Sequence, residues 1–164
     1  MGKGKRFYLK GKEVKLILER VSKTLNLNPL DFLDPNSRFE TMEITPNDKI
    51  LLLDEKPTFI ESGGDIFPTL LNEIVLSKLP SIIVDMGAVP HICNGADIMA
   101  PGVIKVDGEF NVGSIIVIVE GKFSKRIAIA KALITSQEMT GKKYGKVAKN
   151  IHYISDRFWD ALKK

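Results

Sequence analysis

The residues that could carry out chemistry are few, and their spacing does not favour catalysis. The chain has two histidines and one cysteine. His91 and Cys93 are two positions apart, which places them on different faces of a helix, so we do not expect them to share a metal ion. His152 and Asp156 are four positions apart, but no Ser or Cys stands in a context where such a pair would activate it. We therefore expect no catalytic residue, no metal and no cofactor, and we interpret His152 as a packed or capping residue.

A glycine-rich segment is better suited to binding than to catalysis. Residues 84–102 read VDMGAVPHICNGADIMAPG. Glycine and proline let the main chain turn sharply, and alanine keeps the surface low, so another chain can approach the backbone closely. Exposed N–H and C=O groups on such a surface can bond to a sugar-phosphate strand or to unstacked bases. The alternative is that these glycines only build the tight corners of a barrel.

Positive charge is concentrated in two stretches of the chain, which has 24 Lys/Arg and 20 Asp/Glu in total. Residues 1–23 hold eight bases and two acids, whereas residues 24–76 hold three bases and ten acids. Residues 122–149 hold eight bases and one acid. Segregated positive charge is typical of a protein that binds a polyanion. A solvated surface gives the same pattern, and charge alone does not separate the two.

A lysine-rich loop within the last basic stretch is a second candidate contact. It contains Lys142, Lys143, Lys146 and Lys149, and the ring of Tyr144 can stack on a base. The alternative is a loop of solvated lysines without a ligand.

The elements that must position these residues fall into two regions. Residues 1–77 predict a small α+β domain with an amphipathic helix over 11–26. Short strands are expected over 50–53 and 58–60, followed by a helical stretch that Pro80 ends. The rest of the chain, residues 78–164, is predicted to be a mostly-β domain.

The second region predicts a compact barrel or sandwich because it contains many short strands and little helix. Strand-like segments rich in Val and Ile occur at 82–84, 103–106, 115–119, 127–133 and 151–154. The pair Asp107-Gly108 predicts a hairpin turn. A short helix is expected over 88–93, with Gly95 as its C-terminal cap.

Composition excludes several classes of protein. The chain has 164 residues, of which 44% are hydrophobic and 27% are charged, so wholesale disorder is not expected. A single cysteine excludes a disulfide scaffold. No apolar run approaches the length of a membrane span, and no secretory signal is apparent. We therefore expect a soluble, cytoplasmic protein.

Several of these stretches, taken together, resemble the signature of the PUA domain, the RNA-binding pseudobarrel found with pseudouridine synthases and archaeosine transglycosylases. They are VDMGAV (84–89), NGADIMAPGV (94–103), FNVGS (110–114) and RIAIAK (126–131). The end of the chain, together with a short stretch just before the barrel, is similar to the malignant-T-cell-amplified-sequence family of translation-associated proteins, which ligatin-type factors also contain. That second likeness rests on FPTL (67–70), NIHYISD (150–156) and FW (158–159).

The resemblance implies an α+β N-terminal domain before a mostly-β PUA pseudobarrel, and a noncatalytic RNA-binding protein of the translation machinery. Such a protein would recognise the tRNA acceptor end or small-subunit rRNA in initiation or recycling. The implied partners are RNA, the small ribosomal subunit and a separate initiation-factor-one-like protein. The alternative is an accessory subunit that targets an RNA-modification enzyme, and a free-standing enzyme ranks last.

The resemblance also implies where RNA would bind, namely on the first helix of the barrel, the loop after it and the next strand. The matching positions are Gly87, Ala88, His91, Gly95, Ala96, Asp97, Met99, Pro101, Gly102 and Lys105. Asp97 has the wrong sign for a phosphate contact. It could accept a hydrogen bond from a base, from a ribose 2′-OH or from its own backbone.

Overall fold

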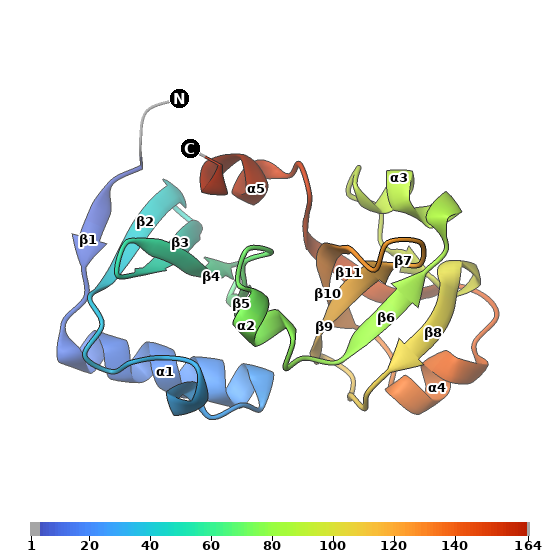
Figure 1. The fold of residues 1–164 in the computed structure, drawn as a ribbon, viewed down its shortest axis with the longest axis horizontal. Coiled ribbons are helices and arrows are strands. Elements are labelled where there is room, and N and C mark those ends of the chain that lie inside the picture. The colour runs from blue at the N-terminus through green and yellow to red at the C-terminus, as the bar shows by residue number, and fades with distance from the viewer. Residues whose placement is uncertain (1–3, 164) are drawn as a thin grey trace. The chain divides into compact units, whose positions relative to one another are not determined.

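The computed structural model describes residues 4–163, which form two compact units that divide between Val75 and Leu76 (Figure 1). The predicted fold class, an α+β region followed by a mostly-β pseudobarrel, is confirmed. None of the helices within the described residues is long and apolar enough to cross a membrane.

The N-terminal unit is an antiparallel sheet with one long helix. Its strands pair in the order β1-β2-β3-β4-β5. Helix α1 forms because Ile17, Val21 and Leu25 recur every four residues and are buried along one stripe. It ends where Asn26 turns into the left-handed region with a φ of 54°. The elements are β1 (Arg6–Tyr8), α1 (Gly11–Leu25), η1 (Pro29–Asp31), β2 (Phe39–Thr45), β3 (Asp48–Leu53), β4 (Lys56–Ser62), β5 (Asp65–Pro68) and α2 (Glu73–Leu76).

The C-terminal unit is a mixed sheet with the strand order β7-β11-β10-β9-β6-β8. Strands β6 and β9 run parallel, and every other pairing in this sheet is antiparallel. Its strands are β6 (Ser81–Val84), β7 (Ile98–Met99), β8 (Val103–Asp107), β9 (Ile115–Glu120), β10 (Arg126–Ala132) and β11 (Lys146–Tyr153). Its helices are η2 (Met86–Ala88), α3 (Val89–Ile92), η3 (Ala100–Gly102), α4 (Ser136–Gly141) and α5 (Arg157–Leu162).

The core of this unit explains why its strands were recognisable. Most residues of β9 and β10 are buried on both faces. A strand that is buried on both faces needs a continuous apolar run rather than an alternating one, and the sequences IIVIVE and RIAIAKA have this character.

The hairpin predicted at Asp107-Gly108 is wrong. Gly108 does turn the chain with a φ of 95°, but β8 pairs with β6, and β9 pairs with β10 and β6. The chain is diverted because Phe110 is buried, and its N–H is bonded to the Ser136 hydroxyl at 3.1 Å. This tertiary contact carries the chain away from β8 before β9 begins.

Two predicted boundaries are also wrong. The last strand begins at Lys146 rather than at residue 151, and its first part was missed because only two buried residues, Val147 and Ala148, lie between exposed lysines there. The helical stretch expected before Pro80 contains only the four residues of α2.

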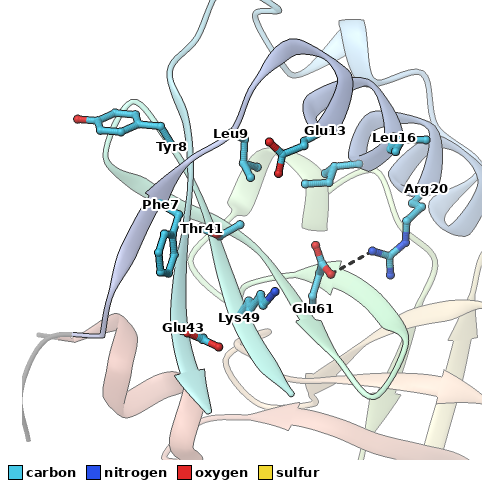
Figure 2. Close-up of a pocket in the computed structure, with 11 residues that line it drawn as sticks. Phe7, Tyr8, Leu9, Glu13, Leu16, Arg20, Thr41, Glu43, Lys49 and Glu61 are labelled. Atoms are coloured by element: carbon cyan, nitrogen blue, oxygen red, sulfur yellow. Dashed lines mark hydrogen bonds and ion pairs between the residues drawn. The ribbon is translucent and has the colours of Figure 1, made fainter. Parts of the chain in front are cut away.

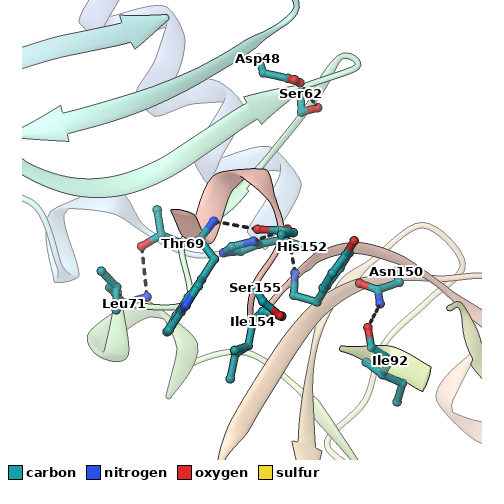
Figure 3. A network of polar contacts seen from close by, with 12 residues as sticks. Asp48, Ser62, Thr69, Leu71, Ile92, Asn150, His152, Ile154 and Ser155 are labelled. Carbon is teal, nitrogen blue, oxygen red and sulfur yellow. Dashed lines mark hydrogen bonds and ion pairs between the residues drawn. The ribbon is translucent and has the colours of Figure 1, made fainter. Parts of the chain in front are cut away.

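A buried polar network holds the end of the C-terminal unit (Figure 3). The Asp156 carboxylate lies 2.9 Å from Nδ1 of His152 and accepts the N–H of Tyr153 at 2.9 Å. Its second oxygen accepts the N–H of Trp159 at 2.7 Å and caps α5. His152 is fully buried and Asp156 is nearly so. The interpretation of His152 as a packed residue is confirmed.

We predict that Asp156→Ala lowers the free energy of unfolding by about 3 kcal/mol, because it removes a helix cap and the acceptor of a buried imidazole together. The measurement is urea unfolding followed by the fluorescence of Trp159, the single tryptophan. Asp160→Ala is the matched control, because Asp160 is exposed on the same helix, and its effect should stay below about 0.5 kcal/mol. Equal effects of the two substitutions would contradict the role of the network.

Candidate nucleic-acid interface

The glycine-rich segment connects β6 to β8 as a series of very short elements. It runs through η2, α3, β7 and η3, and α3 lies at the opposite end of β8 from α4 (Figure 1). The segment closes on itself where the N–H of Asp85 donates to the carbonyl of Gly102 at 2.8 Å. The Asp85 side chain also accepts the N–H of Gly87 at 3.2 Å. These two hydrogen bonds fix the two ends of the segment.

The structure brings most of the predicted RNA-binding positions to the surface. Ala88, Asp97 and Gly102 are half-buried. The exposed positions are Gly87, His91, Gly95, Ala96, Met99, Pro101 and Lys105. Four of these exposed positions have no side chain or a small one, and His91, Met99 and Lys105 add larger side chains.

Three of the small residues, Ala88, Gly95 and Gly102, have an internal role. A Cβ atom on Gly102 would lie 3.2 Å from Cβ of Ala88, so η2 and η3 can pack closely only when both residues are small. Gly95 has a φ of 95°, and a Cβ there would lie 3.1 Å from the Tyr153 hydroxyl. The barrel-corner alternative therefore explains part of the glycine pattern. A Cβ on Gly87 would also be crowded, because it would lie 2.9 Å from Oδ2 of Asp85.

Asn150 on β11 anchors the segment and was not identified from the sequence. Its side-chain amide donates to the carbonyls of Ile92 and Ala96, each at 3.0 Å, and so holds the end of α3 and the loop after it (Figure 3). The N–H of Asn150 donates to Asp97 at 2.9 Å. Nothing in the sequence marked this residue apart from its place in the stretch NIHYISD.

Asp97 is occupied by partners within the protein. It accepts from the backbone of Asn150, and its second oxygen forms an ion pair with Nζ of Lys146 at 2.8 Å. Partial burial raises the pKa of Asp97, but the hydrogen bonds from Lys146 and Asn150 outweigh it, so the net pKa lies below the usual 3.8. Asp97 is therefore a neutralised anchor, and its negative charge is offset beside the candidate RNA surface.

The lysine-rich loop lies against the glycine-rich segment. The N–H of Ala100 donates to the carbonyl of Gly145 at 2.8 Å, and Lys146 pairs with Met99 in the sheet. Two groups of residues that are distant in the sequence thus form one surface. Lys142 and Lys143 follow α4 and are exposed, whereas Lys146 belongs to β11 and is paired with Asp97. The interpretation of residues 142–149 as one loop is wrong, because β11 begins at Lys146.

A separate groove of about 740 Å³ lies in the N-terminal unit, between α1 and the sheet (Figure 2). Exposed Phe7 and Leu16 contribute apolar surface to it. Arg20 and Glu61 form an ion pair across it at 3.0 Å. Within residues 4–163, no group of three His, Cys, Asp or Glu side chains could hold a metal ion.

The two units match two known domain families. Residues 80–154 match the PUA domain, and residues 5–79 match a domain of unknown function, DUF1947. An uncharacterized protein of Methanocaldococcus jannaschii is 31% identical over 159 residues, which cover 95% of this chain and 96% of that protein. The chain belongs to the family of PUA-domain proteins in which DUF1947 precedes the PUA domain. The predicted PUA pseudobarrel is therefore confirmed.

Other relatives of this PUA protein agree with the predicted subfamily resemblance. Malignant T-cell-amplified sequence 2 of Mus musculus is 32% identical over 130 residues, covering 73% of this chain and 66% of that protein. A crystal structure of a hypothetical protein from Pyrococcus horikoshii superposes with a TM-score of 0.83 at 32% identity, over 96% of this chain and 99% of that one. The chain thus carries a PUA RNA-binding domain, and its relatives include translation-associated proteins.

The anchor at Asp97 predicts a pH-dependent contribution to stability. A folded pKa below 3.8 means that the contribution is present above this value and is lost as the pH falls through the lower, folded pKa. We expect Asp97→Asn to cost about 0.5–1 kcal/mol at neutral pH, because both side chains of the ion pair stay partly exposed.

The difference from the wild type should shrink as the pH falls below 3.8 and vanish once the pH is below the lowered, folded pKa, where the carboxyl is protonated in both states. Urea unfolding followed by Trp159 fluorescence measures it across the pH range. Asp107→Asn serves as a control, since Asp107 is an exposed carboxylate at the end of β8. A destabilisation by Asp97→Asn that does not change with pH would refute the ion-pair explanation.

Proposed function

We propose that this PUA protein is a noncatalytic RNA-binding factor of the translation machinery. In this proposal it recognises the acceptor end of tRNA or small-subunit rRNA. The observation that carries the proposal is the low surface of η2, α3 and η3, which lies beside the loop of residues 142–145 with its exposed Lys142 and Lys143. Small side chains leave backbone groups accessible to a sugar-phosphate strand, and the lysines supply the positive charge that this strand requires.

Several of the predicted residues have a proposed role in this mode of binding. His91 and Lys105 are exposed at the edges of the surface and are proposed to contact phosphate or ribose. Gly87, Ala96 and Pro101 let the RNA backbone approach closely, and Met99 offers an exposed apolar side chain against a base. Asp97 keeps Lys146 in place and is proposed to contribute to the shape of the surface rather than to contact RNA.

The proposed role in translation is supported by likeness over both halves of the chain. Translation machinery-associated protein 20 of Saccharomyces cerevisiae matches 79% of this chain at 22% identity. A probable tRNA pseudouridine synthase B of Pyrobaculum aerophilum matches 52% of this chain. The longer match supports a role in translation. Within that role we propose action in initiation or recycling on the small ribosomal subunit, with a separate initiation-factor-one-like protein as partner. The shorter match favours the alternative role, that of an accessory subunit that targets an RNA-modification enzyme.

Fractionation of cell extracts on a sucrose gradient distinguishes these two roles. We expect the protein to sediment with small ribosomal subunits after crosslinking, and sequencing of the crosslinked RNA should return tRNA 3′ ends or small-subunit rRNA. Copurification with a pseudouridine synthase, without ribosomal subunits, would favour the accessory role. Absence of any crosslinked RNA would contradict both.

We predict that replacing Lys142 and Lys143 together by Ala weakens binding to all RNAs and flattens its salt dependence. The slope of log K against log salt should fall by about 0.7–0.9 for each phosphate contact that is lost. Fluorescence anisotropy over a range of salt concentrations measures this slope. Lys56→Ala is the control, because Lys56 is an exposed lysine in the acidic stretch of the N-terminal unit. An unchanged slope in the double variant would mean that these lysines are solvated surface.

A further inference from the structure

We propose that the β9–β10 turn, residues 121–125, is a second nucleotide contact that extends the RNA surface. In this contact the ring of Phe123 stacks on an unpaired base, and Lys122 and Lys125 bind the neighbouring phosphates. The inference rests on the proposed RNA-binding function. It adds that this turn binds an unpaired base of the RNA and the phosphates next to that base.

The turn is held rigidly by a carboxylate that the sequence did not single out. Glu120 is only 3% exposed, and it accepts the N–H groups of Lys122 at 3.2 Å, Phe123 at 2.6 Å and Lys125 at 2.8 Å. These backbone hydrogen bonds, chiefly the one from Lys125, keep the pKa of Glu120 below its usual 4.5. Glu120 is thus ionised at neutral pH. Because its hydrogen bonds already order the turn in the free protein, a ligand that binds there does not have to order it.

This rigid turn presents an aromatic ring to solvent. Phe123 is 75% exposed, although a phenylalanine gains stability from burial. The Lys122 ammonium lies 5.2 Å from the centre of the ring. Residues 121–126, GKFSKR, contain three bases and no acid. A ring flanked by positive charge is the combination that binds single-stranded nucleic acid, because every base has a face that stacks and every linkage carries a phosphate.

The turn adjoins the glycine-rich surface. The N–H of Gly121 donates to the carbonyl of Val84 at 3.0 Å, and a Cβ on Gly121 would lie 3.2 Å from Cδ1 of Ile104. The turn therefore lies next to the end of β6 and the start of β8. An RNA strand on the glycine-rich surface can continue onto it.

The test is binding of the full-length protein to two RNAs, a short hairpin with an unpaired 3′ tail and the same hairpin with a blunt end. We expect Phe123→Ala to weaken binding of the tailed hairpin about tenfold, and binding of the blunt hairpin less than about twofold. Phe123→Trp should keep the affinity, since it keeps a stacking face. Val112→Ala should also keep it, because Val112 is a 64% exposed apolar residue in the loop before β9.

A 2-aminopurine base in the tail gives an independent readout. Its fluorescence should be quenched on binding to the wild type and to Phe123→Trp, but not to Phe123→Ala. If Phe123→Ala binds both RNAs like the wild type, the turn is not an RNA contact, and the proposed function still stands. An equal loss on both RNAs would likewise refute the stacking role. If the wild type binds neither RNA at low salt, the proposed function itself fails.

Discussion

The hydrogen bonds from Asn150 to the carbonyls of Ile92 and Ala96 are the interaction on which the candidate surface depends. The segment between β6 and β8 contains a four-residue helix and a two-residue strand, so its own regular hydrogen bonds cannot keep it in one conformation. Strand β11 supplies the missing constraint through Asn150, and Asp97 bonds back to the same residue. The backbone of the segment is therefore ordered before any ligand arrives, and RNA that binds there does not have to fix it.

The same principle organises the other parts of the surface. Glu120 accepts hydrogen bonds from the β9–β10 turn, and Asp97 forms an ion pair with Lys146. These two carboxylates near the proposed RNA site are therefore bound to donors within the protein. What remains exposed is backbone, small side chains, a few rings and lysines. A surface of this kind recognises the shape and charge of a nucleic acid more than its base sequence.

The sequence predicted those features that depend on local pattern. Strand β9 could be located because its residues form a continuous apolar run, and α1 because its apolar residues recur at helical spacing. The strand order could not be predicted, since β6 pairs with both β8 and β9 and these contacts are distant in the sequence. The chain turns at Asp107-Gly108, but no hairpin forms there because β8 and β9 each pair with β6 and not with each other. The partners of Asp97 could not be predicted because Lys146 and Asn150 lie some fifty positions away in the sequence. The role of Glu120 was missed because a glutamate at the end of a predicted strand does not by itself indicate that it accepts hydrogen bonds from the following turn.

The most direct test is nuclear magnetic resonance of the full-length, ¹⁵N-labelled protein during titration with a tailed RNA hairpin. Binding at the proposed surface should shift the amide signals of residues 85–105, and those of the turn after Glu120, while most signals of the N-terminal sheet stay in place. Shifts confined to the N-terminal unit, or no shifts at low salt, would contradict RNA recognition by the glycine-rich surface.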